Sequence, residues 1–392
     1  MAHVLIGFAE ALPAPEVFFS LKRAGHDVSV FARTAKPALA NLPLKHVFSL
    51  PDVMIDRHGA VEALQRIMDR PEAPDIVLPL DDVGLWLVDA ALGGDPRIAG
   101  ATGESVRVAL DKAVQIRAAR EAGLNVPETS FVSETEPVGK GVAPPALLKP
   151  RHAIDITKTG LTKGDTFYII EDGDIDALSD TLANTRYPML LQPLIHGTGE
   201  GVFGFATRKG ITAWSGHRRV RMMNPHGSGS SACESMTPDK EICAAIDRFM
   251  VNIGWSGPFM MELLRGADGR LWFMELNGRM WGSLALARRQ GLEYPAWSVA
   301  AVLDPDFEPA FEAAPFAEPV VQRNLGRDIL HLLFVLRGPK TDFHRKAWPK
   351  FWQSLRGVLK PAPLRNFYNY DPDHRSYFVR DTIWTIRKAL RR

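Results

Sequence analysis

The sequence predicts a multi-domain protein of mixed α/β and α+β class, with an open parallel sheet first and antiparallel strands later. Three observations support this. The chain has 392 residues, enough for two to four domains at roughly 100–200 residues each. Short apolar runs alternate with helical patterns over the first hundred residues, as in parallel sheets. After residue 190, apolar and polar residues alternate between turn dipeptides, which is typical of antiparallel strands.

Composition narrows the class of protein. The hydrophobic share of 46% and the charged share of 23% are near the globular averages of about 45–50% and about 25%, which excludes a disordered, collagen-like or coiled-coil chain. Lys and Arg number 47 against 45 Asp and Glu, a net charge of +2, so no nucleic-acid partner is expected. The two cysteines, Cys233 and Cys243, suit neither a disulfide scaffold nor a zinc site. No apolar run approaches the ~20 residues that span a bilayer, and the N-terminus lacks a signal-peptide pattern. These features favour a cytoplasmic enzyme.

The first part of the chain predicts a β-α-β arrangement. Strands are expected over residues 4–8, 28–31 and 76–80, and helices over residues 15–24 and 61–68. Ligands of open parallel sheets bind beyond the carboxyl ends of the strands. Four residues fall at those ends: Gly7, Glu10, Asp81 and Asp82.

The middle of the chain adds helices and longer strands. Helices are expected over residues 111–123 and 240–253, and strands over 146–150 and within 190–221, with a turn at Lys209-Gly210. Residues 137–145 are a Pro/Gly-rich break. Strands over 259–264 and 271–276 flank Asp268-Gly269, a strong hairpin signal.

This hairpin carries a candidate metal site. The two-residue period of a strand puts Glu275 and Asn277 on one face, and the hairpin can bring Glu262 opposite them. Carboxylate and amide oxygens suit Mg²⁺. The alternative is an ordinary solvated hairpin face. Because Glu275 and Asn277 interrupt an apolar stretch, metal binding is the favoured interpretation.

Two lysines and a glycine motif are weaker signals. Lys149 ends an apolar strand and can reach a phosphate as a point charge, although, taken alone, a lysine extending to the strand edge is the favoured explanation. Lys112 begins a helix, where charged residues usually face solvent. Gly199 to Gly204 match the GxGxxG dinucleotide pattern, but that pattern requires a following helix, and residues 203–214 predict a hairpin. Glu200 is instead a candidate to accept hydrogen bonds from ribose hydroxyls.

Together these pieces, in this order, resemble the ATP-grasp superfamily over residues 1–305. Within it they look most like the carbamoyl-phosphate-synthase-like carboxylate–amine ligases. The matching pieces are Asp111-Lys112 before a helix that ends in Gly-Leu-Asn-Val-Pro, Leu148-Lys149-Pro150, the hinge-like residues 190–197, the Gly/Ser segment 227–231, and the series Glu262, Glu275, Asn277 and Arg279.

The resemblance implies three regions: an N-terminal α/β domain over 1–105, a small lid subdomain over 106–190 and a large subdomain with the metal site over 191–305. A basic, aromatic extension over 306–392 follows, which the resemblance does not cover. The resemblance also implies a role for each matching residue. Lys112 and Lys149 would contact the ATP phosphates. The backbone of Gln192, Pro193, Leu194 and Ile195 would pair with adenine, and Glu200 would hold the ribose. Glu262, Glu275 and Asn277 would bind two Mg²⁺ ions, with Mn²⁺ as a substitute, and Arg279, Arg219 and Arg221 would hold the substrate or the transferred phosphate.

Two positions depart from the superfamily pattern. Pro193 stands where the hinge usually carries an acidic residue, and it has no N–H to donate. The segment after Lys149, residues 151–160, lacks the usual glycine-rich lid sequence. Neither departure touches the metal residues.

The implied activity is an ATP-dependent ligase that joins a small-molecule carboxylate to an amine through an acyl phosphate and releases ADP and phosphate. The alternatives are a phosphotransferase acting on a hydroxyl and a non-catalytic nucleotide-binding module. The sequence leaves the acid, the amine and the oligomeric state open, a homodimer included.

The C-terminal region differs in kind. Residues 331–392 hold 14 Lys and Arg, 4 Asp and 11 aromatic residues. A helical surface appendage is the simpler interpretation. Trp348, Phe351, Trp352 and Leu355 have helical spacing with basic neighbours, a pattern that also suits a peripheral membrane surface or another anionic partner.

Overall fold

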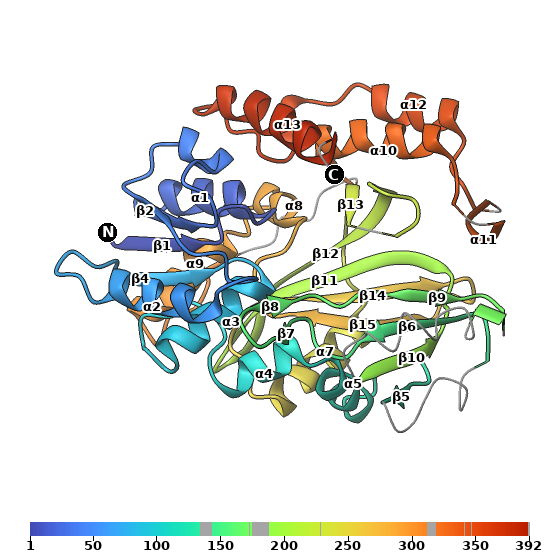
Figure 1. Cartoon of the computed structure of the whole chain (residues 1–392), viewed down its shortest axis with the longest axis horizontal. Coiled ribbons are helices and arrows are strands. Elements are labelled where there is room, and N and C mark those ends of the chain that lie inside the picture. Colours follow the sequence, from blue (N-terminus) through green and yellow to red (C-terminus); the bar gives the residue numbers. More distant parts are fainter. Residues whose placement is uncertain are drawn as a thin grey trace.

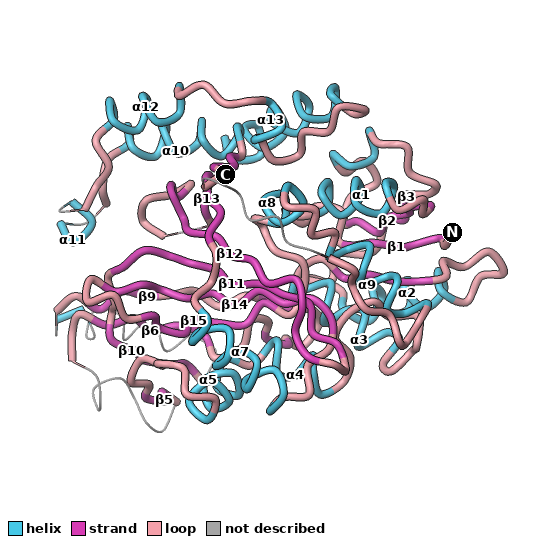
Figure 2. The backbone as a smooth tube through the Cα atoms, turned by 180° about the vertical axis from the view of Figure 1, so that it is seen from behind, coloured by secondary structure: helices cyan, strands magenta, loops and turns pink. Residues whose placement is uncertain are grey.

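A computed structural model describes residues 1–133, 143–171, 173–174, 188–227, 229–311, 319–340, 342–345 and 347–390. Three main sheets and a C-terminal helical layer make up the molecule (Figures 1 and 2). The N-terminal sheet is parallel, and a four-stranded and a six-stranded sheet that follow are antiparallel. The predicted mixture of α/β and α+β regions is therefore confirmed.

The N-terminal sheet has the order β3-β2-β1-β4. Its strands are β1 (His3–Gly7), β2 (Asp27–Ala32), β3 (Val47–Ser49) and β4 (Ile76–Pro79), and its helices are α1 (Ala14–Arg23), α2 (Arg57–Met68) and α3 (Asp82–Leu92). β1 is buried along its whole length because helices cover both faces of such a sheet. The predicted strands and helices are present. β3 and α3 were not predicted; α3 begins where the Asp81 side chain accepts the Gly84 N–H at 2.7 Å.

The four-stranded sheet has the order β5-β10-β6-β9. Its strands are β5 (Ser130–Val132), β6 (Ala146–Pro150), β9 (Phe167–Ile169) and β10 (Met189–Pro193), and α4 (Glu104–Leu110) and α5 (Lys112–Glu121) precede it. β7 (Asp155–Ile156) and β8 (Leu161–Thr162) form a separate pair. The predicted subdomain boundary after residue 190 cuts through β10, so the chain crosses to the next sheet at residues 194–196 instead. Much of the predicted lid, residues 134–142 and 175–187, lies outside the described residues.

The six-stranded sheet has the order β15-β14-β11-β12-β13-β16. These strands are β11 (Gly197–Thr207), β12 (Gly210–Met222), β13 (Ser230–Met236), β14 (Gly257–Gly266), β15 (Leu271–Asn277) and β16 (Val321–Arg323), with α7 (Lys240–Asn252), α8 (Leu284–Arg289) and α9 (Tyr294–Leu303) around them. Gly199 and Gly204 both lie inside β11, and β12 follows as a hairpin. Rejecting the dinucleotide motif was therefore right.

Successive side chains of β11 point to opposite faces of this sheet, and each face packs against a different hydrophobic core. Val202 packs into a core with Met261 and Phe249 of α7, whereas its neighbour Phe203 packs into a core with Trp281 and Tyr294. The second face continues toward Glu262 and Asn277, which lie on it with Met260.

The C-terminal helices are α10 (Leu325–Arg337), α11 (Asp342–Arg345), α12 (Phe351–Leu359) and α13 (Arg375–Leu390). They were predicted as an appendage, but β16 pairs with β13 and so joins this region to the six-stranded sheet. Helix α13 lies over α1 and α10 over β13 (Figure 1), and the His374 ring stacks on Phe19 at 5.7 Å. None of the helices in the described part of the chain is long and apolar enough to cross a membrane.

Candidate active site

A cavity of about 490 Å³ opens on the second face of the six-stranded sheet. It collects five of the predicted site residues from three chain segments: Arg219, Glu262, Glu275, Asn277 and Arg279. Only the tertiary fold brings Arg219 of β12 next to the β14–β15 hairpin. The structure therefore places these five residues around one cavity.

The two glutamates face each other across the hairpin. Glu262 pairs in register with Glu275, and Met260 pairs with Asn277. Burial, together with the negative charge of Glu275, raises the pKa of Glu262, although Arg219 opposes the shift. Arg219 donates a hydrogen bond to Glu262 at 2.5 Å. Two carboxylates held this close repel each other, and one guanidinium neutralises only part of their charge.

Two lysines form the positive side of the site. Lys149 is 8% exposed, and burial, followed by the charge of Lys112, lowers its pKa to about 8. Glu275 and Glu262 act on Lys149 in the opposite direction, so Lys149 lies within electrostatic reach of both carboxylates. In the described part of the chain, no carboxylate oxygen comes within 4.0 Å of the Lys149 ammonium. Neither lysine lines the cavity itself.

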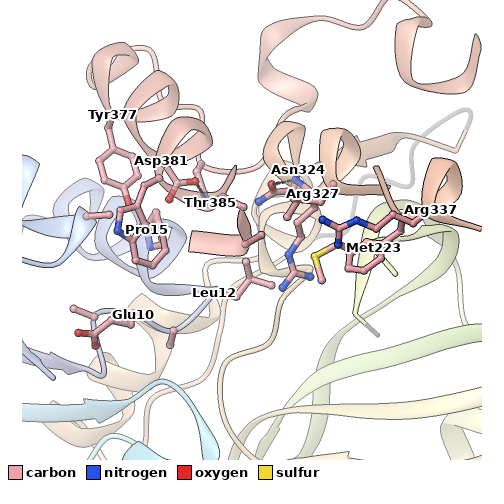
Figure 3. Close-up of a pocket in the computed structure, with 18 residues that line it drawn as sticks. Glu10, Leu12, Pro15, Met223, Asn324, Arg327, Arg337, Tyr377, Asp381 and Thr385 are labelled. Atoms are coloured by element: carbon pink, nitrogen blue, oxygen red, sulfur yellow. Dashed lines mark hydrogen bonds between the residues drawn. The ribbon is translucent and has the colours of Figure 1, made fainter. Parts of the chain in front are cut away.

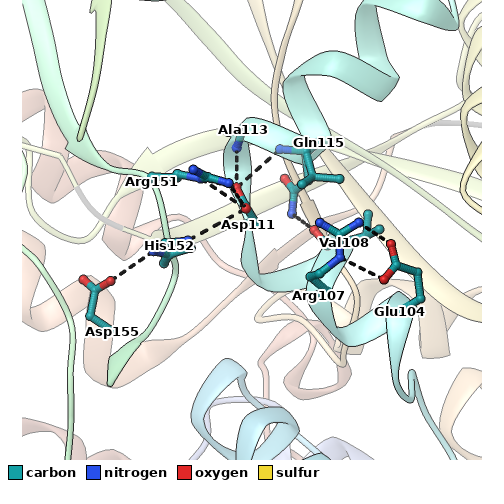
Figure 4. A network of polar contacts seen from close by, with 10 residues as sticks. Glu104, Arg107, Val108, Asp111, Ala113, Gln115, Arg151, His152 and Asp155 are labelled. Carbon is teal, nitrogen blue, oxygen red and sulfur yellow. Dashed lines mark hydrogen bonds and ion pairs between the residues drawn. The ribbon is translucent and has the colours of Figure 1, made fainter. Parts of the chain in front are cut away.

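A polar network around Asp111 joins the start of α5 to Arg151, which follows β6 (Figure 4). Asp111 caps α5 by accepting the Ala113 N–H at 2.9 Å, and Arg151 donates to both of its oxygens at 2.9 and 2.6 Å. The Lys112 N–H in turn donates to the Arg151 carbonyl at 3.0 Å. Because Arg151 follows Lys149 by two residues and Asp111 precedes Lys112, this clamp sets the spacing of the lysine pair.

Gln115 of α5 holds the strand that carries two of the candidate metal ligands, Glu275 and Asn277. Its side chain accepts the Leu276 N–H at 2.9 Å and donates to the Leu276 carbonyl at 3.2 Å. It also donates to the Val108 and Ala109 carbonyls at 3.0 and 2.9 Å. Leu276 separates Glu275 from Asn277 on the edge strand β15, so Gln115 fixes the backbone between them. Sequence reasoning missed this residue, which reads as an ordinary helical glutamine.

Arg279 connects the site to the N-terminal sheet. Its guanidinium donates to both oxygens of Asp82, at 3.0 and 3.4 Å. Burial lowers the pKa of Arg279, but the negative charge of Asp82 has the larger effect, and the pKa is raised overall. Asp82 stands just beyond the carboxyl end of β4, where ligand-facing groups were expected.

The structure separates Arg221 from Arg219, contrary to their predicted pairing. A β-bulge interrupts the β12–β13 register between the two residues, which breaks the two-residue alternation that would put them on one face. Arg219 reaches Glu262, whereas Arg221 forms an ion pair with Asp328 of α10. Arg221 therefore contributes to the attachment of the C-terminal helices and does not line the cavity.

Glu200 and the hinge residues lie apart from the cavity. Glu200 is fully buried, and Arg265 donates to both of its oxygens at 2.9 Å while Arg218 donates to one at 3.1 Å. It faces away from Glu262, because its neighbour Gly201 is the residue in register with Glu262. Gln192 and Pro193 end β10, and the Leu194 N–H already donates to the Pro145 carbonyl at 2.9 Å. Ile195 lies in the crossing between the two antiparallel sheets.

His217 is a further site residue that the sequence analysis missed. Its Nδ1 lies 2.7 Å from the Ser283 hydroxyl oxygen, and its buried Nε2 has no hydrogen-bond partner among the residues that the structure describes. Burial and the nearby charge of Arg219 lower its pKa to about 3, so the ring is neutral. It precedes Arg219 by two residues and lines the same cavity, so strand alternation alone could have identified it.

The residues present fit a magnesium nucleotide. An incompletely neutralised carboxylate pair calls for a cation, and a lysine pair without a close counter-ion calls for an anion. Glu262, Glu275 and Asn277 supply hard oxygen ligands that suit Mg²⁺. Over the described ranges no group of three or more His, Cys, Asp and Glu forms a metal-binding cluster. The candidate site uses two carboxylates and an amide instead.

The chain matches no protein-family model and no curated protein sequence. Its structure is similar to several solved structures. An L-amino acid ligase from Bacillus licheniformis is 14% identical, with a TM-score of 0.62 over 83% of this chain and 80% of that one. An N5-carboxyaminoimidazole ribonucleotide synthetase in complex with ADP is 16% identical, with a TM-score of 0.62 over 86% of each chain.

A third similar structure is the biotin carboxylase domain dimer of the Hydrogenobacter thermophilus 2-oxoglutarate carboxylase, in complex with MgADP, ADP and bicarbonate. It is 14% identical, with a TM-score of 0.64 over 82% of this chain and 74% of that one. At such low identities the comparisons establish architecture and not activity. The chain has the ATP-grasp fold that its sequence motifs predicted.

Proposed function

We propose that the protein is an ATP-dependent carboxylate–amine ligase that forms an amide bond through an acyl phosphate and releases ADP and phosphate. One observation carries the proposal: Glu262 and Glu275 lie in register across one hairpin, and they line a cavity together with Arg219, Asn277 and Arg279. The similar solved structures include a ligase and ADP complexes, which supports the same class of reaction.

The chemistry follows from charge. Attack of a carboxylate on the γ-phosphate of ATP brings two anions together, and Lys112, Lys149 and Arg279 offset that repulsion. Bound Mg²⁺ would add charge neutralisation and hold the phosphate oxygens through Glu262, Glu275 and Asn277. The carboxylate oxygen forms the new P–O bond as the bond to ADP breaks. A neutral amine then attacks the acyl carbon, and phosphate leaves with the C–O bond electrons. The reaction requires that water be kept from the intermediate, which it would otherwise hydrolyse.

Finer parts of this assignment rest on the sequence resemblance. They are the two Mg²⁺ ions with Mn²⁺ as a substitute, and the adenine contacts of residues 192–195. The hinge position is supported by the crossing at residues 194–196. A ribose contact by Glu200 would require rearrangement, because Arg218 and Arg265 already hold its oxygens.

The test is a pairwise screen of acids and amines for release of ADP and phosphate. A ligase releases both only when acid and amine are present together, whereas a phosphotransferase releases ADP with a hydroxyl substrate and keeps the phosphate in the product. With a productive pair, ¹⁸O in the acid should appear in the released phosphate. Label retained entirely in the organic product would overturn the acyl-phosphate route.

A separate proposal is that the C-terminal region binds an anionic membrane surface. It is supported by α12, where Trp352 is 71% and Leu359 is 69% exposed between Lys350 and Lys360. Co-sedimentation should then occur with vesicles that contain phosphatidylserine and not with phosphatidylcholine alone. Equal recovery of the protein with both kinds of vesicle would reject the proposed binding to an anionic surface.

The oligomeric state is a separate question. Light scattering would decide whether the chain forms a homodimer.

A further inference from the structure

A second cavity, also of about 490 Å³, adjoins the candidate active site. Its walls come from the loop after β1, from α10 and from α13 (Figure 3). The two cavities share Leu12 and Arg327 in their linings, so Arg327 stands at their junction. A ligand of the second cavity could therefore present one end to Arg279 and the two glutamates.

Most polar groups in this lining already have protein partners. Asn324 caps α10 by accepting the Arg327 N–H at 3.0 Å, and Asn369 donates to Asp381 at 2.6 Å. Glu10 accepts the Arg33 N–H at 2.9 Å through Oε1, whereas its buried Oε2 has no hydrogen-bond partner among the described residues. Apart from this acceptor, these groups leave little hydrogen-bonding capacity for a ligand.

The Arg327 guanidinium is different. Its side chain points from α10 toward Leu12 and Met223 (Figure 3). It donates one hydrogen bond, to the Ser230 carbonyl at 3.1 Å, although a guanidinium carries five donors. Within the described ranges no carboxylate oxygen lies within 4.0 Å of it. An arginine with free donors in an enclosed site is suited to bind a planar carboxylate.

The rest of the wall is largely apolar. Leu12, Leu330, Phe334 and Trp384 contribute the larger apolar surfaces, and Arg337 lies at the rim with its guanidinium 5.8 Å from the Phe334 ring centroid. A volume of this size accommodates a whole small molecule. The positive charge of Arg327 would repel a protonated amine at the end of a ligand and would attract a carboxylate.

We propose that this second cavity binds the acid substrate, a carboxylate with an extended apolar body, and that Arg327 holds its carboxylate at the junction with the phosphoryl site. The proposal rests on the proposed ligase function and names the substrate class. It also gives the C-terminal helices a role, because α10 and α13 form the walls that select the apolar body.

Straight-chain acids provide the test. Butyrate, hexanoate, octanoate and decanoate are titrated calorimetrically into the full chain saturated with Mg²⁺ and a non-hydrolysable ATP analogue. Each added methylene should tighten the Kd about fourfold if it is buried. Trp384→Ala and Phe334→Ala should flatten this dependence. Arg327→Met should weaken octanoate binding by roughly ten- to a hundredfold, while Arg270→Met, an exposed arginine on the β14–β15 turn, should leave it unchanged.

The outcomes separate this proposal from the ligase assignment. Failure of the nucleotide analogue to bind would count against the proposed function. Normal nucleotide binding with a flat chain-length series, or with octylamine bound more tightly than octanoate, would overturn the cavity assignment alone. Arg327→Lys keeps the charge and loses the planar fork, so octanoate binding should be weaker than in the wild type and tighter than in Arg327→Met. It decides the case if the methionine variant fails to fold.

Discussion

Lys149 carries the clearest conflict between stability and function at the scale of single residues. Its pKa of about 8 in the folded chain lies below the ordinary lysine value, so the charged form destabilises the fold. That cost is full below pH 8 and disappears as the pH rises past the ordinary value. Lys149→Met should therefore raise the melting temperature of the nucleotide-free protein at pH 7. Lys209→Met, at an exposed turn, is the control, and no difference between the two variants would contradict the assignment.

The same lysine predicts a pH-dependent affinity for nucleotide. Phosphate is attracted to the protonated form, which predominates below pH 8. Affinity for Mg·ATP should then decline as the pH rises through about 8, with proton uptake on binding. Calorimetry in buffers of different ionisation enthalpy measures that uptake. In Lys149→Met the affinity should be roughly ten- to a hundredfold weaker and this part of the pH profile flat. An unchanged profile in the variant would remove Lys149 from the phosphate site.

Glu275 and Asn277 should matter for turnover and little for folding. Glu275→Gln removes a charge that repels Glu262. Asn277→Ala removes a side-chain amide whose nitrogen contacts the Met260 sulfur at 3.7 Å, so little stabilisation is lost. We expect both variants to abolish acid- and amine-dependent ADP release while the melting temperature stays close to that of the wild type. Near-normal turnover in both would exclude them as metal ligands.

At the scale of elements, Gln115 is the residue that joins α5 to β15. Gln115→Leu would remove the hydrogen-bond partner of the Leu276 N–H and of three carbonyls, those of Val108, Ala109 and Leu276. Each buried group left unsatisfied costs about 1–3 kcal/mol. We expect a loss of stability together with a weaker affinity for Mg²⁺. Gln65→Leu is the matched control, because Gln65 makes a single bond, to the Ala91 carbonyl at 2.9 Å. Equal effects of the two variants would show that Gln115 has no special role in holding β15.

These contacts also show which parts of the site could be predicted from the sequence. Strand alternation and the Asp268-Gly269 turn were enough to place Glu262 opposite Glu275, because both signals are local. The bulge that separates Arg219 from Arg221 has no local signature. Gln115 and Leu276 meet only through the tertiary fold, 161 residues apart in sequence. Long-range contacts of this kind decide which predicted residues meet.

At the scale of the whole molecule, the C-terminal region is built into the site and is not an appendage. Its sequence differs in charge and aromatic content, which suggested a separate surface element. The structure instead inserts β16 beside β13 and places α10 and α13 around the second cavity. The N-terminal sheet is joined to the same region, since Glu16 accepts the Asn369 N–H at 2.7 Å. The site is therefore assembled from all parts of the chain.

One buried ion pair tests this whole-molecule view. Asp328 of α10 has no exposed side-chain surface, and it pairs with Arg221 of β12 and lies 3.8 Å from the Arg323 Nε. Asp328→Ala leaves two arginines without a counter-charge in the interior, so the stability should fall by about 3–5 kcal/mol.

The pair Arg208–Asp306 supplies the contrast, because its side chains are 79% and 89% exposed and such pairs contribute about 0–1 kcal/mol. Urea unfolding of Asp328→Ala and Asp306→Ala measures the difference, and trypsin should cleave the Asp328 variant faster within residues 319–345. Arg327 directly precedes Asp328 on α10, so loosening this helix should also displace Arg327. Acid binding should therefore weaken more than nucleotide binding. If the two aspartate variants unfold alike, the C-terminal helices are attached to the sheet by something other than this ion pair.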